Sequence, residues 1–390
     1  MGMRTVGCQC ESRAARLSRF MLLAIGAYFC SGGGLWAQTP DSPTSDANKS
    51  WTDTTESQSD NLNPTRTVES HTHSGNRTLD SQSVQRRGSS GQFEPYQDVE
   101  KEAVKLDANT VRTTTRTYGR DSDGAKTLLQ VTEEEKHNLP GGGSNVVRST
   151  SNPDANGDLQ LVQRQIEETK KISKDVEETK TTVMLPSING GVAPAMQVEE
   201  RRERGANDTV QSQKTTLLPD GAGHWQVGEV QRSTIKQEGK SRSTEEQISR
   251  PDSEDNMGEV SRTVSKAAES ASGEKRDTVE TYSVDAPGLA RDGSLHLVER
   301  ATTIQHSSPT GQQTTEKQVE QPNPGEPNSG LQVTTRTIDI VRPGPSGAQA
   351  TRSIQTRDVN GTLGVVSVDT TKSDNVQAIQ VQIAPSEKPK

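Results

Sequence analysis

The sequence predicts an all-β, elongated antiparallel array of β-hairpins, and three observations support this prediction. Turn glycines recur about every 33 residues, with a drift of roughly 4, which is typical of a repeat array. The strand after each turn alternates apolar and polar residues, as Leu159 and Leu161 do after Gly157. All periods but one hold a second turn site with Gly or Pro, and two turn sites in a period indicate two strands. Because hydrophobic residues make up only 27% of the chain, the repeat must organise the fold without a thick core.

Residues 1–37 have the pattern of a secretory signal peptide. Several arginines precede the apolar run 20–29, and a small residue, Ala37, follows at the expected cleavage site. We therefore expect a mature N-terminus at Gln38. Lipidation of Cys30 is a less favoured alternative, since bulky aromatic residues precede this cysteine.

Signal cleavage would also remove every cysteine, because Cys8, Cys10 and Cys30 all lie in the first 37 residues. An exported chain without disulfides must be held by sheet hydrogen bonds and packing. Loss of four arginines and Glu11 would shift the formal net charge from -8 to about -11.

Residues 38–81 are rich in Ser, Thr and Asn and contain scattered prolines. Such a composition does not offset the loss of chain entropy on folding, so we predict a disordered spacer. His71 and His73 lie in this segment. Because no third metal ligand is fixed nearby, we interpret them as solvated histidines rather than a metal site.

The repeat array is predicted over residues 82–384, followed by a polar tail at 385–390. Its first copy is atypical, with Phe93 and Tyr96, as expected for a residue pair that covers the open end of an array. Clear copies run from Val111 to Asp369, and a final strand is expected within 376–383. The structural turns are assigned to Gly124, Gly157, Gly190, Gly223, Gly258, Gly293, Gly330 and Gly361.

In one copy the sequence is compatible with either a helix or a hairpin. Residues 163–180 contain neither Gly nor Pro and are compatible with a helix. The hairpin alternative places the second turn of this copy within 170–175, in register with its neighbours.

Two stretches around the turns, Tyr118–Gly124 and Tyr282–Leu289, resemble the Tyr-Asp repeats of bacterial surface and toxin-shell proteins. Those repeats also build β-hairpins in long arrays, so the resemblance implies the same kind of fold. It covers only these stretches, and the period here is longer.

A membrane-spanning closed sheet of roughly sixteen to eighteen strands would also fit the chain length. It is disfavoured because Thr, Glu, Arg and Gln occupy both faces of the predicted strands, where one face would have to be apolar.

The sequence contains no nucleophile elbow, P-loop, zinc-protease motif or dinucleotide fingerprint. We therefore expect no enzyme activity, no cofactor and no metal, and we interpret Trp225 and Tyr282 as packing residues. No basic stripe is present, so a nucleic-acid partner is not expected. The predicted function is that of an exported structural or adhesive protein, periplasmic or extracellular, with envelope polysaccharide or another surface protein as partner. The alternative is a module that binds polysaccharide or peptide through a strand face or edge.

Overall fold

The computed structural model describes residues 48–373, except for gaps at 60–61, 89, 122, 287, 289–292, 324, 345–346 and 359–360. The chain divides into Met1–Asp46 and Ala47–Lys390, and the described residues all belong to the second unit. The predicted signal peptide, the final strand within 376–383 and the polar tail lie outside the described residues.

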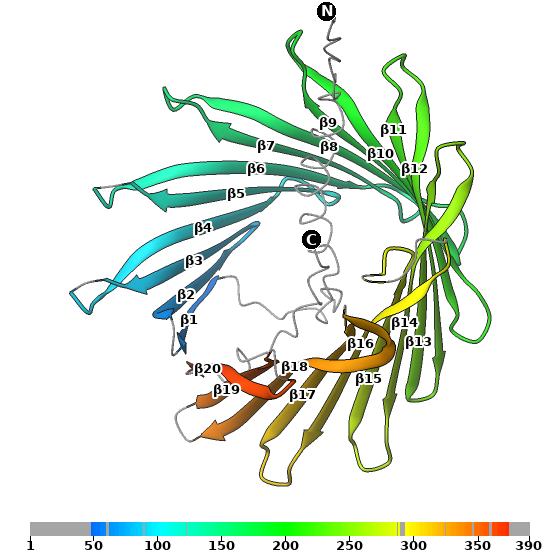
Figure 1. Cartoon of the computed structure of the whole chain (residues 1–390). Coiled ribbons are helices and arrows are strands. Elements are labelled where there is room, and N and C mark those ends of the chain that lie inside the picture. Colours follow the sequence, from blue (N-terminus) through cyan, green and yellow to red (C-terminus); the bar gives the residue numbers. More distant parts are fainter. Residues whose placement is uncertain are drawn as a thin grey trace, which may run out of the picture. The chain divides into compact units, whose positions relative to one another are not determined.

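All the regular elements of the described part are β-strands, numbered along the chain in Figure 1. No helix in this part is long and apolar enough to cross a membrane. The strands are β1 (Asn48–Ser59), β2 (Leu62–Ser74), β3 (Arg77–Arg87), β4 (Phe93–Lys105), β5 (Thr110–Arg120), β6 (Lys126–Asn138), β7 (Ser144–Pro153), β8 (Leu159–Lys171), β9 (Val176–Pro186), β10 (Val192–Arg204), β11 (Val210–Pro219), β12 (Trp225–Glu238), β13 (Ser241–Pro251), β14 (Met257–Glu269), β15 (Lys275–Ser283), β16 (His296–Ser307), β17 (Gln313–Asn323), β18 (Glu326–Gly344), β19 (Gly347–Arg357) and β20 (Leu363–Ser373).

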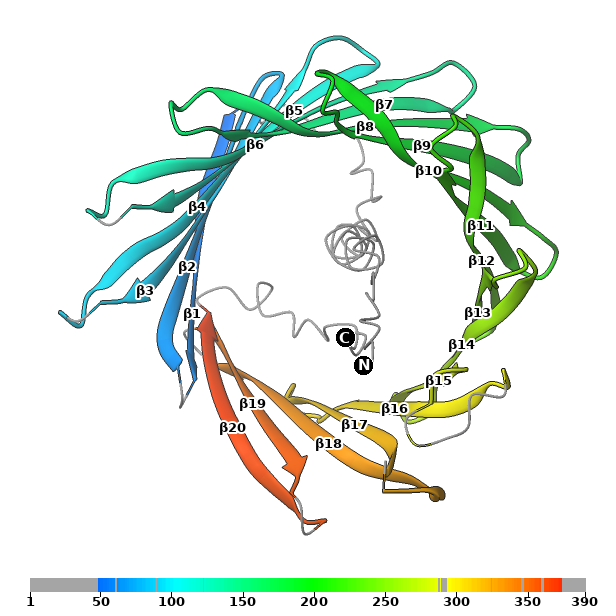
Figure 2. The same cartoon turned by 45° about the horizontal axis from the view of Figure 1, so that its top comes forward.

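Each strand pairs antiparallel with the strand that follows it in sequence, so the predicted all-β hairpin array is confirmed. The array also joins its own ends, because β1 pairs with β20 from Thr55–Ser373 to Ser59–Asp369. The sheet is therefore closed, and Figure 2 shows its strands arranged in a ring. The sequence had left open whether the array is a flat sheet, a twisted ribbon or a solenoid.

A β-bulge recurs in the even-numbered strands from β4 to β20. In β8, for example, Thr150 pairs with Gln163 and Ser151 with Leu161, so Val162 is the extra residue. Val162 follows the turn residue Gly157 by five positions, and the same offset separates Gly124 from the extra residue of β6. The extra residues are Tyr96, Leu129, Val162, Ala195, Gly228, Val260, Val298, Thr334 and Val366.

These bulges give a physical reason for the closure of the sheet. A bulge bends its strand and increases the local twist. Repeated on every second strand, it adds curvature in the same sense around the array, which is the device by which sheets are curved. Because the bulge also fixes the register of each hairpin, the repeat specifies both pairing and curvature.

The sheet is a single layer, and Val183, the most buried side chain of the described residues, lies in a small apolar cluster on one face of β9 and β10. Val183 is 1% exposed, and its register partners are Gln165 and Met196. Met196 and Val198 are also buried. Because side chains alternate between faces along a strand, Lys180 in β9 lies on the opposite face. Burial of one Val side chain contributes about 1.5–3 kcal/mol, so local clusters of this kind replace a thick core.

Two expectations from the sequence are resolved by the strand positions. The prediction of a disordered spacer is wrong for 48–81, which contains β1, β2 and part of β3. These polar strands are held by the backbone ladder and by hydroxyl pairs such as Ser70–Ser81, at 2.7 Å. The helical alternative for 163–180 is also wrong, since this stretch forms parts of β8 and β9 with a turn at 172–175.

Candidate functional site

Seven of the eight predicted turn glycines have left-handed backbone angles, with φ between 78° and 96°. Six of them, Gly124, Gly157, Gly190, Gly223, Gly293 and Gly361, lie between strands, whereas Gly330 has the same left-handed angle inside β18. The assignment of Gly258 is wrong. Gly258 lies inside β14, and Asp255, with φ 62°, takes the turn position of that copy.

An aspartate three residues before the turn residue organises several of these turns. In the turn at Gly157, the Asp154 Oδ1 atom accepts hydrogen bonds from the backbone N–H groups of Asn156 and Asp158, at 2.8 and 3.0 Å. These bonds lower the pKa of Asp154 from its ordinary value, and the bond from Asn156 has the largest effect. Asp220 and Asp252 form the same pattern with the same effect on their pKa values. These carboxylates are therefore structural groups that cap turns.

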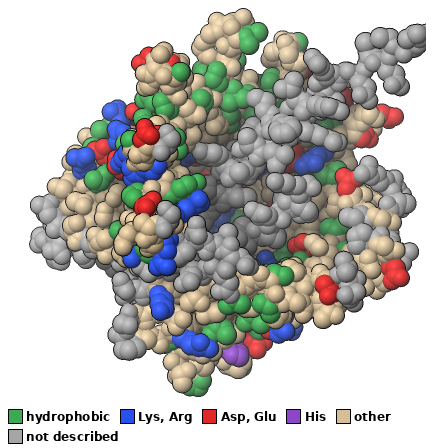
Figure 3. All heavy atoms as spheres, turned by 60° about the vertical axis from the view of Figure 1, so that its left-hand side comes forward, with side chains coloured by type: hydrophobic (Ala, Val, Ile, Leu, Met, Phe, Trp, Pro, Cys, Tyr) green, Lys and Arg blue, Asp and Glu red, His purple; other side chains and the backbone are tan. Residues whose placement is uncertain are grey.

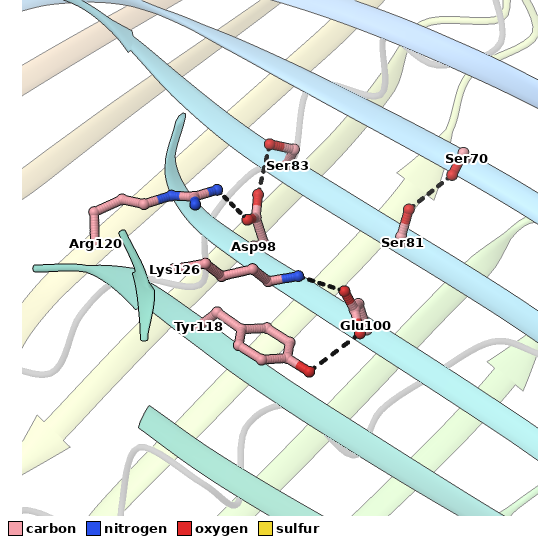
Figure 4. Close-up of polar contacts among 8 residues, drawn as sticks. All are labelled: Ser70, Ser81, Ser83, Asp98, Glu100, Tyr118, Arg120 and Lys126. Atoms are coloured by element: carbon pink, nitrogen blue, oxygen red, sulfur yellow. Dashed lines mark hydrogen bonds and ion pairs between the residues drawn. The ribbon is translucent and has the colours of Figure 1, made fainter. Parts of the chain in front are cut away.

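A network of polar side chains crosses β2 to β6, shown in Figure 4. Asp98 pairs with Arg120 and accepts a hydrogen bond from the Ser83 hydroxyl, at 2.7 Å. Glu100 accepts hydrogen bonds from the Lys126 ammonium at 2.6 Å and from the Tyr118 hydroxyl at 3.2 Å. The figure also includes the hydroxyl pair between β2 and β3.

The charges of this network stabilise one another. Burial, reinforced by the Glu100 carboxylate, raises the pKa of Tyr118, and the hydrogen bond to Glu100 raises the pKa of Lys126. Tyr118 therefore stays a neutral hydrogen-bond donor and Lys126 stays a cation near neutral pH. Neither group has the pKa that a general base requires.

A hollow of about 360 Å³ lies on β8 to β11. Its charged side chains alternate in sign across the strands. Lys180 lies 3.6 Å from Glu199, and Arg201 lies 2.7 Å from Glu178. Because these carboxylates have cationic partners, the hollow offers a polar binding surface rather than a pair of catalytic acids. Its lining residues are Glu168, Lys170, Glu178, Thr179, Lys180, Glu199, Glu200, Arg201, Gln213 and Thr215.

Arginines and aromatic rings meet at two places in β2 to β4. Because successive residues of a strand point to opposite faces, the contacts of Arg87 and Arg86 lie on opposite faces of the sheet. The guanidinium carbons of Arg66 and Arg87 lie 4.3 and 5.4 Å from the centre of the Phe93 ring. That of Arg86 lies 3.7 Å from the centre of the Tyr96 ring. Figure 3 turns these strands forward and shows charged side chains of both signs among hydrophobic ones.

The remaining residues singled out in the sequence have local partners. His71 Nδ1 lies 3.0 Å from Asp80 Oδ1, and His73 Nδ1 lies 3.1 Å from the Thr78 hydroxyl. In the part of the chain that the structure describes, no group of three or more His, Cys, Asp or Glu side chains could hold a metal ion.

The two aromatic residues of the later copies also differ from a ligand-binding pair. Trp225 is half-buried at the start of β12, opposite Pro219 in the register. The Tyr282 hydroxyl donates a hydrogen bond to Glu280, at 3.0 Å, and burial raises the pKa of Tyr282. Tyr282 is thus engaged by a residue of its own strand.

No protein-family model and no curated protein match this chain.

Proposed function

We propose that the protein is an exported, non-catalytic structural or adhesive repeat protein of the cell envelope or the extracellular space. The observation that carries this proposal is the repetition of a bulged hairpin, which recurs in the even-numbered strands from β4 to β20. A repeat array distributes its surface over many equivalent copies, whereas a catalytic site concentrates its chemistry in one place.

The paired charges support the same proposal. Ion pairs such as Arg112–Glu135 and Arg300–Glu280 join neighbouring strands at 2.9 Å. Cross-strand pairs of this kind stabilise a sheet and fix its register. In this function they serve cohesion and solubility rather than a reaction.

The test uses two deletions of equal length that respect the repeat. Deletion of 121–153 removes β6 and β7 and joins Arg120 to Asp154, the first residue of the next equivalent turn. Deletion of 154–186 removes β8 and β9 and joins Pro153 to Ser187 in the same way. Each deletion thus keeps an odd strand, a turn and a bulged even strand at the junction.

For a structural protein, we expect both shortened chains to fold cooperatively, as measured by circular dichroism and thermal unfolding. Both should also remain in the envelope or secreted fraction of the producing cells to the same extent as the full chain. Loss of that retention in one deletion, with the other unaffected and both folded, would replace the structural function by a localised site.

Export is tested separately by mass spectrometry of the protein recovered from outside the cytoplasm. Cleavage after Ala37 gives a chain that begins at Gln38. An intact N-terminus, or a diacylglycerol on Cys30, would contradict the proposed processing.

A second candidate function is a binding module for extracellular polysaccharide or peptide. The hollow on β8 to β11 favours it, because hydroxyl, amide and charged groups converge there in a space of about 360 Å³. Under this function, deletion of 154–186 would abolish ligand binding, while deletion of 121–153 would leave it intact.

A further inference from the structure

Toward the bulged turns, neighbouring hairpins are no longer paired with one another. β8 pairs with β7 from Leu159 onward, whereas its pairing with β9 begins only at Arg164. β6 and β12 show the same offset, and Figure 1 shows the hairpins separating toward these tips. Within the part of the chain that the structure describes, the first residues of these even-numbered strands therefore have a strand partner on one side only.

Side chains bridge several of the gaps between these hairpins. The Arg357 Nε–H group, for example, donates a hydrogen bond to the Val333 carbonyl across the gap between β18 and β19, at 2.6 Å. The other side-chain bridges are Asp98–Arg120, Gln130–Asn152, Glu229–Arg250 and Glu299–Gln321. Among the described residues, no side-chain hydrogen bond or ion pair crosses the gap between β8 and β9.

The open edge of β8 presents both backbone groups and apolar side chains. The Asp154 N–H donates to the Asp158 carbonyl at 2.9 Å, so the backbone groups of Leu159 and Leu161 point away from β7. Leu159 is 50% and Leu161 is 36% exposed. Pro186, at the end of β9, has no N–H to donate, so β9 cannot complete this edge. An unpaired apolar edge of this kind is a site at which a further strand adds.

The next hairpin shows how such an edge is blocked. Pro194 follows Gly190 by four residues, as Leu161 follows Gly157. The nitrogen of Pro194 therefore lies at the outer edge of β10 and carries no hydrogen. Because proline at an edge prevents strand addition, β8 keeps open the edge that β10 has blocked.

A segment beyond the described residues has the sequence pattern of a strand that fits this edge. Ile379, Val381 and Ile383 alternate with glutamines, as Leu159 and Leu161 flank Gln160. On an added strand, this alternation places the apolar side chains beside the leucines and the glutamines on the other face.

The segment is too close to Ser373 to reach the β8 edge of its own chain. Ser373 pairs with Ala348, at the end of the sheet opposite the bulged turns. Val365 takes in β20 the position of Leu161 in β8 and lies about 26 Å from Ser373 along the strand. Residues 374–381 span at most about 28 Å, which the return along β20 alone would use. Figure 2 places β8 and β20 on opposite sides of the ring.

We propose that the protein assembles end to end by strand addition: residues 379–383 of one copy pair with the open edge of β8 in the next copy. The two surfaces of this contact lie at opposite ends of the sheet, so the contact is heterologous and builds a linear array of copies. This assembly rests on the structural function proposed above and adds a partner to it, a second copy of the chain.

The first measurement is the mass of the purified full chain by light scattering at rising concentration. We expect assemblies that grow with concentration. A chain truncated after Ser373 should remain a monomer. A fluorescent peptide of residues 374–390 should bind the truncated chain, as measured by anisotropy.

Variants then place the binding on the edge of β8. Leu161→Pro copies the block in β10 and should weaken peptide binding by about tenfold or more, since a backbone donor and an apolar side chain are lost. Leu161→Lys keeps the donor, adds a charge to the apolar edge and should also weaken binding. The matched control is Val227→Pro at the equivalent position of β12, whose gap is bridged by Glu229 and Arg250. It should leave binding unchanged.

A mixing experiment tests the direction of assembly. The full chain with Leu161→Pro keeps the added segment but lacks the edge, and the truncated chain keeps the edge but lacks the segment. Each should be monomeric alone, and the mixture should form a complex of two chains and no larger assembly. Circular dichroism establishes that every variant is folded.

Several outcomes would overturn the proposal. A full chain that stays monomeric would do so, as would a truncated chain that assembles like the full one. Equal loss of peptide binding in Leu161→Pro and Val227→Pro, or no loss in Leu161→Pro, would remove the edge of β8 as the site. These results leave the structural function intact, since that function is tested by retention of the two deletion chains in cells.

Discussion

Substitution of Gly157 by Val tests whether the left-handed turn residue determines the hairpin. Gly157 has φ 86°, and a Cβ atom added there would meet no other atom within 4 Å. A Cβ added at Gly258 would also meet no atom within 4 Å, but Gly258 lies in β14 without a left-handed angle. The two glycines therefore differ in backbone conformation and not in available space, which makes Gly258→Val the matched control.

The expected magnitude follows from this difference. A left-handed angle costs an L-residue about 1–2 kcal/mol, and a β-branched side chain raises that cost. Because Gly157→Val creates no clash, its whole effect on the free energy of unfolding should be this backbone strain. Gly258→Val should be neutral or slightly stabilising, since Val favours strands by a few tenths of a kcal/mol.

The assay is urea unfolding followed by circular dichroism, with the unfolding midpoint compared at constant slope. Asp255 has φ 62°, an angle that strains a residue other than glycine. A third variant, Asp255→Gly, removes this strain and should stabilise the protein by about 0.5–1 kcal/mol. Equal effects at Gly157 and Gly258, or no loss of stability in Gly157→Val, would refute the role assigned to the turn.

Three further predictions concern packing, charge and pH. Val183→Ala should lower the unfolding free energy by about 2 kcal/mol, as measured by urea unfolding, because Val183 is 1% exposed. Arg352→Gln should cost about 3 kcal/mol by leaving the buried Asp339 unpaired, whereas Arg112→Gln breaks an exposed pair and should cost less than about 1 kcal/mol. Asp154 has a lowered pKa in the folded state, so its stabilising effect is present above the ordinary Asp pKa and is lost as the pH falls through the lowered value. The stability difference between the wild type and Asp154→Asn should therefore shrink below about pH 4, as measured by unfolding across pH 2–6.

The hairpins could be predicted from the sequence because their turns are encoded locally. A residue in a left-handed conformation is usually Gly, so the recurrence of Gly marks the array. The exception, Asp255, escaped this rule because a non-glycine residue occupies the position. A signal was nevertheless present, since Asp252 precedes Asp255 by three residues, as Asp154 precedes Gly157.

The bulges and the closure of the sheet were not predictable in the same way. The extra residue of the bulge can be as different as Tyr96 and Gly228, so no residue type marks the bulge in the sequence. The strands within 48–81 were not predicted, because a polar segment that cannot form a hydrophobic core was expected to be disordered. A single-layer sheet needs little core, since backbone pairing and cross-strand side chains provide its cohesion.

The contact between Arg66 and Phe93 shows why side-chain contacts across a sheet are difficult to predict from the sequence. Phe93 and Tyr96 stood out in the sequence as rare aromatic residues, but their partners did not. Arg66 reaches Phe93 from β2, two strands away, and only the strand register brings these residues together. A contact between residues of separate strands leaves no continuous motif in the sequence.

Because β1 pairs with β20, the strand arrangement does not determine between which two strands the chain must begin and end. In an open array the terminal strands are fixed by geometry, but here every strand has two neighbours. A circular permutant that links the ends of β1 and β20 and opens the chain at 172–175 would retain every strand pair. The strands joined by no turn would then be β8 and β9, paired from Arg164–Met184 to Lys171–Glu177, in place of β1 and β20, paired from Thr55–Ser373 to Ser59–Asp369 within the described residues. The place where the chain begins and ends could thus move around the ring without a change in its strand neighbours.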